Sequence, residues 1–471
     1  MIATWWCGQK KEMDYVIDHI DELVIKKIDR TTGSDTFIGH QLSKAQKEEL
    51  LRKIKYEPFL YAGQEAVNWK DLNPRLGLAY DLFGNGKTAL KVSANRYVLG
   101  EGTGRASAIN PIQSNNTMQR QWIDANNDRV IQGDPLNPAL NGELGPSLSP
   151  NFGRPSNSLR YDREWSHGFQ NRPYNWEFSG SVQHELMPRM SINAAYFRRL
   201  YGNFTVTDSV LVGPSDYQSY CVSAPADARL PDGGGERICD LRDVASAALA
   251  GQLAVDRLTT FASNYGDQVE RWNGVDLTLN ARLPQLLLQG GVSTGRTYEN
   301  DCEVVQNVPE AAPAARGAAN SERFCETQSP FLTQFKLLGA YTLPYDIQLS
   351  GTYQTSAGPE ITAIGTFLND QVRPSLGRNL STGSSASVGL VEPKTEYGER
   401  LHQVDLRFSK RFSLNRMRFQ ATLDLYNALN GNTVLVQNNQ YGATTAANPA
   451  WQRPQAILPA RIVKVGLQMN F

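Results

Sequence analysis

The chain has 471 residues, of which 40% are hydrophobic, and its 47 Lys and Arg residues balance its 47 Asp and Glu residues. This balance leaves no net field to attract nucleic acid, so nucleic-acid binding is excluded. No uninterrupted apolar run reaches the roughly 18 residues that a membrane-spanning helix requires, which excludes a helical membrane protein.

Residues 1–65 differ in pattern from everything that follows. Apolar residues recur there at helical spacing, at Met13, Val16, Ile17, Ile20, Leu23 and Val24. Ser43 and Gln46 have the spacing of a capping box, which predicts a second helix through Leu50 and Ile54. We expect a small helical segment that is foreign to the rest of the chain. Residues 1–7 are too short for the apolar core of an export signal, so no signal peptide is expected here.

From Asn73 onward, the apolar period changes from 3.6 to two. Leu76, Leu78 and Tyr80 alternate with small or polar residues, and a Gly/Asn-rich turn at residues 83–87 leads into a second alternating run. This pattern predicts a β-hairpin. Hairpins of the same kind recur along residues 176–196, 275–292, 331–353 and 404–425, and a last alternating run begins at Val463. The sequence therefore predicts about eleven strands, each near the roughly 10 residues that cross a bilayer at a tilt.

The connections between these strands are alternately short and long. Each hairpin turn takes a few residues, whereas the links between hairpins take tens of residues, at 99–173, 208–270, 297–329, 359–399 and 431–459. Long links are uncommon in compact soluble domains, but short turns on one side and long loops on the other are typical of a transmembrane barrel. The pattern therefore favours an antiparallel transmembrane β-barrel over a soluble β-sandwich or propeller.

The residues between the apolar ones are strongly polar. The charged members of this set are Lys91, Asp276, Arg282, Lys336, Asp405, Arg407, Arg418 and Asp424. In a soluble sandwich they would form the solvated face, whereas in a barrel they would line the lumen.

The last nine residues place an apolar side chain at every second position and end on an aromatic residue. These positions are Val463, Val465, Leu467, Met469 and Phe471. A closing barrel strand of this kind would carry the signal read by a barrel-assembly machinery. The same alternation could also cap a soluble sandwich.

The five cysteines form two local pairs and leave Cys7 unpaired. Cys221 and Cys239 bracket a Gly/Pro-rich stretch, and Cys302 and Cys325 bracket an Ala-rich one. Two loop-closing disulfides are therefore expected in an oxidising compartment, with unpaired loop thiols as the alternative. No Cys-x-x-Cys spacing occurs, so no metal site of that kind is expected.

Other candidate sites have ordinary explanations. Asp124, Asn126 and Asp128 resemble the start of a calcium-binding loop. Such a loop requires Gly where this chain has Arg129 and a bidentate Glu where it has Pro135. We therefore interpret this segment as an Asx-rich loop without calcium. The sequence offers no catalytic motif, and no cofactor is expected. The loop aromatics could stack on a sugar or chelate, although the preferred interpretation is a place in the aromatic girdle at the membrane interface, or packing between loops. These residues are Trp122, Tyr161, Trp165, Tyr174 and Trp451.

Several segments, taken in order, resemble the barrel of TonB-dependent outer-membrane receptors, in the class with a carboxypeptidase-regulatory-like N-terminal domain. They are residues 73–88 (NPRLGLAYDLFGNGKT), 274–283, 289–297 and 423–430 (LDLYNALN). The resemblance covers residues 68–471. It implies energy-coupled uptake of a bulky nutrient, such as a glycan fragment or metal chelate, across the outer membrane of a Gram-negative-type bacterium. The family barrel has 22 strands and a plug, and it engages the TonB energy-transducing complex.

This chain departs from that family pattern. It offers about half of the strands and neither the plug nor the regulatory-like domain, so we expect a truncated or fused form. Two alternatives stay open: a soluble extracellular β-rich adhesin or lectin, and an outer-membrane barrel hydrolase. The hydrolase would need a nucleophile beside His184 or His402, and the sequence shows none.

Overall fold

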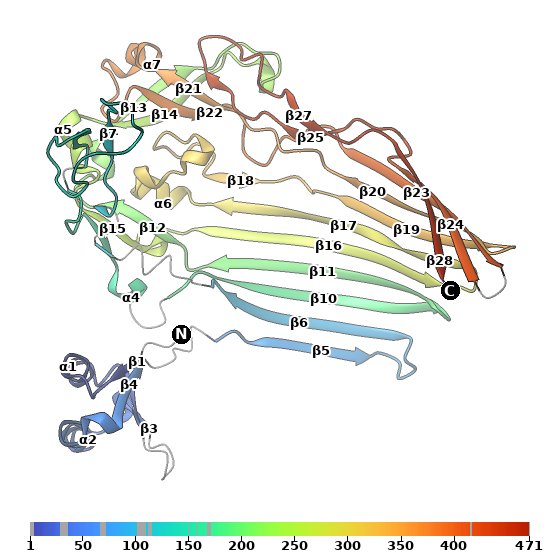
Figure 1. Cartoon of the computed structure of the whole chain (residues 1–471), viewed down its shortest axis with the longest axis horizontal. Helices are drawn as coiled ribbons and strands as arrows, with labels where there is room; N and C mark the ends of the chain where they lie inside the picture. Colours follow the sequence, from blue (N-terminus) through green and yellow to red (C-terminus); the bar gives the residue numbers. More distant parts are fainter. Residues whose placement is uncertain are drawn as a thin grey trace. The chain divides into compact units, whose positions relative to one another are not determined.

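The computed structural model describes residues 4–28, 36–65, 72–100, 110–111, 115–149, 151–156, 158–166, 171–414 and 417–470 (Figure 1). The chain divides into two compact units. The first comprises Met1–Pro74 and Asp162–Pro173, and the second comprises Arg75–Tyr161 and Tyr174–Phe471. None of the described helices is both long enough and apolar enough to cross a membrane.

The N-terminal unit is a small α/β fold in which a four-stranded sheet has the order β1-β4-β2-β3. Its elements are β1 (Thr4–Trp6), α1 (Lys10–Asp18), β2 (Leu23–Lys27), β3 (Thr36–Ile38), η1 (Gly39–Gln41), α2 (Lys44–Tyr56), η2 (Pro58–Leu60), β4 (Tyr61–Glu65) and, from its second segment, α4 (Arg163–Ser166). The core contains Val16 of α1, Ile25 of β2, and Leu50 and Ile54 of α2. The predicted capping box is present, because the Ser43 hydroxyl accepts from Gln46 N–H while the Gln46 side chain accepts from Ser43 N–H.

The prediction that helix would continue through Leu23 and Val24 was wrong. Helix α1 ends at Asp18, and these two residues begin strand β2, which pairs antiparallel with β4. Leu23 and Ile25 are buried on one face of the sheet. A short apolar run satisfies the helical and the extended period equally well, and here pairing with a distant strand decides between them.

The second unit is built on a twelve-stranded antiparallel sheet with the order β28-β24-β23-β20-β19-β17-β16-β11-β10-β6-β5, and β18 pairs with β17 off this path. The path therefore has eleven strands, as the sequence predicted. Their bounds are β5 (Arg75–Asp81), β6 (Thr88–Val98), β10 (Tyr174–Met187), β11 (Met190–Gly202), β16 (Val269–Arg282), β17 (Leu286–Asn300), β19 (Gln334–Leu343), β20 (Ile347–Ser356), β23 (Leu401–Leu414), β24 (Met417–Tyr426) and β28 (Ile462–Asn470), with β18 at Glu326–Gln328.

The strand register gathers the predicted apolar residues on one face of this sheet. The paired residues include Leu78↔Val92, Tyr196↔Val275, Leu277↔Val292, Leu406↔Leu425 and Leu423↔Val465. Since Cβ atoms alternate along a strand, the polar residues between them share the opposite face. We call these the apolar face and the polar face. The sheet is the wall of a partial antiparallel β-barrel.

Large side chains of the apolar face are exposed. Leu277 in β16 is 45% exposed and Leu349 in β20 is 48% exposed, although both lie in the middle of the sheet. The buried core clusters described for this unit lie in its long connections and not against the apolar face. A soluble sandwich would cover such a face with a second layer.

The long connections fold into small sheets and helices. Their strands are β7 (Arg120–Trp122), β8 (Leu144–Ser147), β9 (Leu159–Tyr161), β12 (Thr205–Ser209), β13 (Tyr217–Ser223), β14 (Arg237–Val244), β15 (Arg257–Phe261), β21 (Ile364–Leu368), β22 (Ser385–Gly389), β25 (Val434–Gln437), β26 (Gly442–Ala443) and β27 (Pro454–Ile457); the helices are η5 (Pro214–Asp216), η6 (Pro231–Gly233), α5 (Ala247–Gln252), η7 (Ala262–Asn264), α6 (Cys302–Asn307), η8 (Pro309–Ala311), η9 (Ala314–Arg316) and α7 (Asn369–Leu376). The long links that the sequence predicted are therefore present, and they carry secondary structure of their own. Their largest core joins β13, β14, α7, β22, Tyr441 and Trp451.

Candidate functional site

The polar face of the sheet holds the charged residues that the sequence singled out. Asp276 of β16 lies opposite Ser293 of β17, and its Oδ1 accepts a hydrogen bond from the Ser293 hydroxyl at 2.6 Å. Arg407 of β23 donates from Nε and Nη2 to the two carboxylate oxygens of Asp424 in β24, at 2.6 and 2.9 Å. Each of these contacts joins two neighbouring strands, β16 with β17 and β23 with β24, and stabilises the register of that pair.

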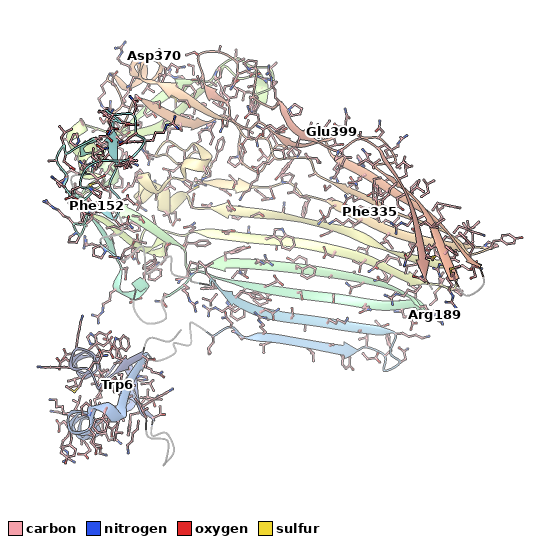
Figure 2. The ribbon with its side chains drawn as sticks, in the orientation of Figure 1. Trp6, Phe152, Arg189, Phe335, Asp370 and Glu399 are labelled. Atoms are coloured by element: carbon pink, nitrogen blue, oxygen red, sulfur yellow. A yellow bond between two sulfur atoms is a disulfide. The ribbon has the colours of Figure 1, made fainter. Side chains whose placement is uncertain are left out.

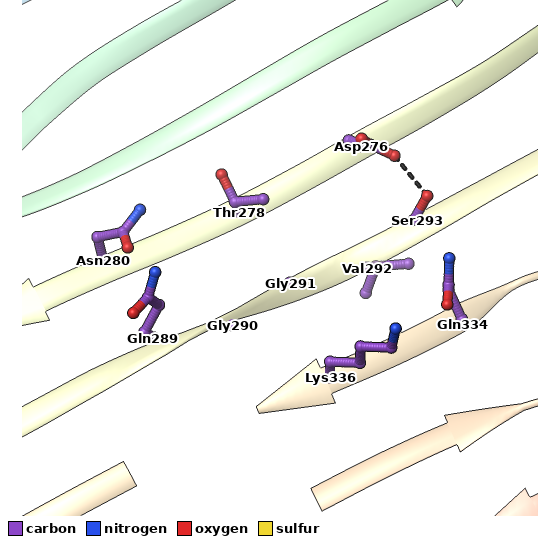
Figure 3. Close-up of a pocket in the computed structure, with 10 residues that line it drawn as sticks. All are labelled: Asp276, Thr278, Asn280, Gln289, Gly290, Gly291, Val292, Ser293, Gln334 and Lys336. Carbon is purple, nitrogen blue, oxygen red and sulfur yellow. Dashed lines mark hydrogen bonds between the residues drawn. The ribbon is translucent and has the colours of Figure 1, made fainter. Parts of the chain in front are cut away.

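A cavity of about 430 Å³ opens on the polar face over β16, β17 and β19 (Figure 3). Its charged groups are the Asp276 carboxylate and the Lys336 ammonium. Further hydrogen-bonding groups come from the hydroxyls of Thr278 and Ser293 and the amides of Asn280, Gln289 and Gln334. Gly291 lies at its floor, where an added Cβ would come within 2.3 Å of the Leu277 carbonyl oxygen. The cavity can therefore contact a polar ligand through several hydrogen-bond donors and acceptors.

A second cavity, of about 540 Å³, lies at the short-turn end of the polar face. It is lined by Lys87, Lys91, Arg189, Arg282 and one carboxylate, Glu185. Arg189 stands in the short turn between β10 and β11, at the end of the strands away from the long connections (Figure 2). The short-turn end of the polar face at β6, β10, β11 and β16 is therefore predominantly cationic.

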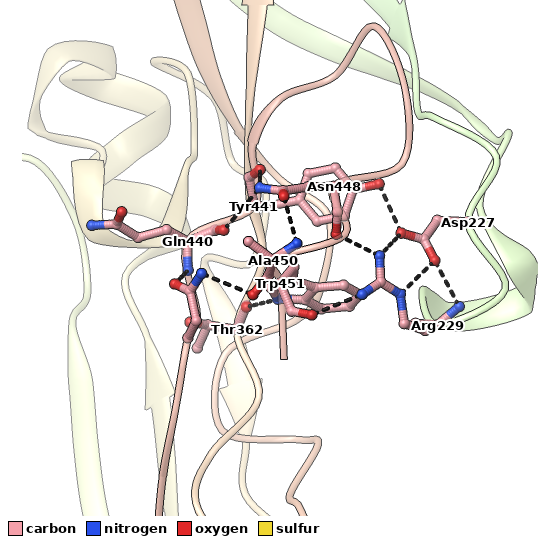
Figure 4. Close-up of polar contacts among 9 residues, drawn as sticks. Asp227, Arg229, Thr362, Gln440, Tyr441, Asn448, Ala450 and Trp451 are labelled. Carbon is pink, nitrogen blue, oxygen red and sulfur yellow. Dashed lines mark hydrogen bonds and ion pairs between the residues drawn. The ribbon is translucent and has the colours of Figure 1, made fainter. Parts of the chain in front are cut away.

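The long connections are held together by a polar cluster around a buried tryptophan (Figure 4). Arg229 donates from Nε and Nη2 to Asp227 at 2.9 and 2.7 Å, and from Nη1 to the Trp451 carbonyl oxygen at 2.7 Å. The Tyr441 hydroxyl donates to Asp227 Oδ2 at 3.1 Å. The Arg229 guanidinium lowers the pKa of Asp227, and burial raises the pKa of Tyr441 to about 12.

The loop aromatics differ in their surroundings. Trp451 is 1% exposed and donates from Nε1 to the Thr362 carbonyl oxygen, and Trp165 is also buried. Tyr174 lies under the Arg96 guanidinium, which is 4.4 Å from its ring centre. Trp122 is exposed in part, although its Nε1 donates to Glu143. Of these residues, Trp451 packs in the core of the connections, whereas Tyr174 begins strand β10 and Trp165 belongs to the N-terminal unit.

The four loop cysteines are joined in the pairs named from the sequence, Cys221 with Cys239 and Cys302 with Cys325. The first pair ties β13 to β14, and the second ties the start of α6 to the segment that leads into β18. Cys7, in the core of the N-terminal unit, is a free thiol, and burial raises its pKa to about 11.

The loop at Asp124 is held by more hydrogen bonds than its sequence indicated. The Asp124 carboxylate accepts from the backbone N–H groups of Asp128 and Arg129, and Arg129 adopts the left-handed φ of 60° that favours glycine. Glu143 brings a third carboxylate to Asp124 and Asp128, with oxygen atoms within 4.8 Å of one another. Sequence reasoning missed Glu143 because the β7–β8 pairing, not chain spacing, places it there. Its two oxygens accept from Trp122 Nε1 and Ala125 N–H.

The remaining sites named from the sequence lie on the sheet. Val463, Val465, Leu467 and Met469 stand exposed on the apolar face of β28, and Phe471 lies outside the described residues. The His184 and His402 rings share hydrogen bonds with the Thr88 and Tyr353 hydroxyls, each at 2.9 Å. Neither of these two hydrogen bonds joins a histidine to a serine, as a hydrolase nucleophile would require.

Comparisons by sequence and by structure find different relatives. The family model of circularly permuted ATP-grasp type 2 proteins matches residues 1–88. A putative glutamate–cysteine ligase of Frankia casuarinae is 31% identical over 67 residues, which are 14% of this chain and 8% of that protein. An uncharacterized protein of Synechocystis is 27% identical over 67 residues, 14% of each chain. The chain thus spans a small part of the curated relatives it matches.

Solved structures resemble most of this chain at low identity. The outer-membrane transporter YddB of Escherichia coli is 12% identical with a TM-score of 0.39, and the alignment covers 83% of this chain and 39% of that one. The ferripyoverdine receptor of Pseudomonas aeruginosa is 10% identical with a TM-score of 0.37, with 87% and 34% covered. This chain spans less than two-fifths of either structure.

Proposed function

We propose that residues 75–471 are part of the wall of an outer-membrane transport barrel. The observation that carries this proposal is the apolar face, which has exposed large side chains from β5 at one end of the eleven-strand path to β28 at the other, while the opposite face carries the charged residues. Hydrocarbon tails are the environment in which such a face is stable, because water is excluded there and every strand of a closed barrel is hydrogen-bonded.

The cargo that we propose is a bulky, polar nutrient such as a glycan fragment or metal chelate. The cavity beside Asp276 and Lys336 offers hydrogen-bonding groups and both signs of charge, as a polar cargo would require. The segments that resemble TonB-dependent receptors support coupling to a TonB complex, with barrel-assembly machinery as the insertion partner. Because the chain spans only part of such receptors, transport would require the complete barrel.

We further propose that the N-terminal unit is a piece of an ATP-grasp-type protein fused to the barrel portion. The match over residues 1–88 and the 67-residue similarity to a putative ligase support this origin. We propose no enzymatic role for this chain, because 67 residues are a small part of the ligase.

Neighbouring residues of β16 provide a test of the barrel proposal. Leu277 lies on the apolar face and Thr278 on the polar face, so Leu277→Arg and Thr278→Arg place the same charge on opposite sides of one strand. On the lipid-facing side of a barrel, an arginine near the bilayer midplane destabilises the folded, membrane-inserted state by about 2–4 kcal/mol. We expect Leu277→Arg to abolish flotation of the refolded chain with phosphatidylcholine vesicles, and Thr278→Arg to leave it unchanged.

The alternatives give different results in the same experiment. A soluble adhesin or lectin would remain in the aqueous fraction without detergent, and neither substitution would change its flotation. If both arginine variants and the parent chain stayed in that fraction, the membrane assignment would be wrong.

A further inference from the structure

The cavity at the short-turn end of the polar face gathers positive charge from separate strands. Its volume is about 540 Å³, and four cationic side chains line it, those of Lys87, Lys91, Arg189 and Arg282. Glu185 is the one carboxylate in this lining, which leaves the cavity with a formal charge of +3. The whole chain, in contrast, has equal numbers of positive and negative residues.

The four cations of the cavity lack counter-charges of their own. In the part of the chain that the structure describes, none of them forms an ion pair, and Lys91 donates a hydrogen bond to the neutral Gln183 amide at 2.6 Å. Farther along the polar face, Arg407 is paired with the Asp424 carboxylate. Like charges that share a cavity repel one another, so the binding of an anion lowers the electrostatic free energy there.

The strand order divides these cations into two groups. Lys91 lies on β6 and Lys87 directly before it, whereas Arg282 ends β16 and Arg189 stands in the turn before β11. The Arg282 N–H donates to the Arg189 carbonyl oxygen at 2.8 Å, so these two arginines are neighbours. Strand β10 separates β6 from β11, and β16 is the next strand. The backbones of the two groups are therefore about 10–14 Å apart, two to three strand spacings.

We propose that this cavity binds an elongated small molecule that carries two or more phosphate or carboxylate groups. One anionic group of the ligand contacts the lysine pair, and another contacts the arginine pair. A guanidinium can donate two parallel hydrogen bonds to either kind of anion, which suits both groups of ligand. The Ser191 hydroxyl and the Asn280 amide line the cavity as well and can bind polar atoms in the middle of the ligand.

This anion site goes beyond the cargo cavity proposed above. The two cavities have Asn280 in common, but the cargo cavity has charges of both signs, at Asp276 and Lys336. The anion site depends on side chains of the polar face and not on what covers the opposite, apolar face. It can therefore be tested separately from the membrane assignment.

The test is isothermal titration of the full chain refolded in dodecyl maltoside micelles, which requires no insertion into a bilayer and leaves the sheet edges open to water. Two elongated anions, inorganic tripolyphosphate and suberate, are compared with orthophosphate and acetate. We expect each elongated anion to bind about tenfold or more tightly than its single-group counterpart, because its second anionic group binds intramolecularly. The tighter of the two elongated probes identifies which anionic group the site favours.

Substitutions of the exposed cations assign the binding to this cavity. Lys87→Gln with Lys91→Gln, and Arg189→Gln with Arg282→Gln, each remove one group, and we expect each pair to weaken tripolyphosphate binding about tenfold. Arg411→Gln with Arg418→Gln is the matched control, because it removes two exposed cations at the short-turn end of β23 and β24. This control pair should leave the affinity unchanged.

Glu185→Gln provides a test with the opposite sign. Since it removes the one negative charge in the lining, we expect it to strengthen tripolyphosphate binding about threefold. A merely structural role of Glu185 would not strengthen binding.

The possible failures are distinguishable. Equal affinities for the elongated and the single-group anions, or an equal loss in the control pair and the cavity pairs, would overturn the anion site and leave the barrel assignment standing. A chain that keeps the expected affinities but does not float with vesicles would overturn the barrel assignment and leave the anion site standing.

Discussion

Arg407 and Asp424 face each other across β23 and β24, where the guanidinium donates to both carboxylate oxygens at 2.6 and 2.9 Å. The Asp424 side chain is 4% exposed, and the pair lies on the polar face, with β24 next to β28 in the sheet. A bidentate pair between adjacent strands holds one register, because a slip by one residue would move each side chain to the opposite face.

This geometry predicts that Asp424→Asn lowers the yield and the thermal stability of the refolded sheet, since Arg407 would lose its paired charge. The double exchange Arg407→Asp with Asp424→Arg should restore part of both. The measurement is heat-dependent migration in detergent gels, with Thr278→Arg as a control on the same face. Equal stability of Asp424→Asn and the parent chain would contradict a role in register.

Removal of the Trp451 ring should loosen the folded connections without dissolving the sheet. Trp451 packs against Tyr441 with ring centres 5.1 Å apart and is fully buried. Truncation of such a residue to alanine lowers the free energy of unfolding by about 3–5 kcal/mol.

 We expect Trp451→Ala to accelerate thermolysin cleavage within residues 431–459, while Trp122→Ala, at a more exposed ring, has a smaller effect. Unchanged cleavage of Trp451→Ala would show that the connections do not depend on this core.

Loss of the disulfide between Cys221 and Cys239 should destabilise the β13–β14 hairpin. A disulfide that closes a loop of this length stabilises by about 2–4 kcal/mol, mainly by restricting the unfolded chain. Cys221→Ser with Cys239→Ser should therefore lower the urea midpoint for the connections, as followed by protease resistance. Cys7→Ser, which removes a thiol outside either disulfide, should not change that midpoint.

The connections should also lose stability in acid. Arg229 lowers the pKa of Asp227, so the folded state favours the charged carboxylate. The stability that this pair contributes is present above the unfolded pKa of about 4 and is lost as the pH falls through the lower folded pKa. Protease resistance measured between neutral pH and pH 3 should fall less steeply in Asp227→Asn than in the parent chain, and identical profiles would contradict the assignment.

The Cys7 thiol should react slowly in the folded N-terminal unit. Burial raises its pKa to about 11, and the thiolate is the reactive form. Iodoacetamide at pH 8 should modify Cys7 slowly in buffer and rapidly in urea. Ile54→Ala, which opens the core around this thiol, should accelerate the reaction in buffer, and a rate as high in the folded parent chain as in urea would show that the thiol is accessible.

The sequence by itself determined the strands of the sheet and which face each residue occupies. Alternation along Leu277, Leu279 and their neighbours is a local property, since successive side chains of an extended strand must point to opposite faces. The short turns and the capping box at Ser43 are local in the same sense, and the structure has them where the sequence predicted.

Only the tertiary structure decided the features that depend on contacts between distant segments. Val24 became part of a strand through pairing with β4, Glu143 reached Asp124 through the β7–β8 pairing, and Trp451 was buried by segments more than 60 residues away. No local period encodes such contacts, because they form only when the free energy of packing two remote segments exceeds the entropy lost in bringing them together.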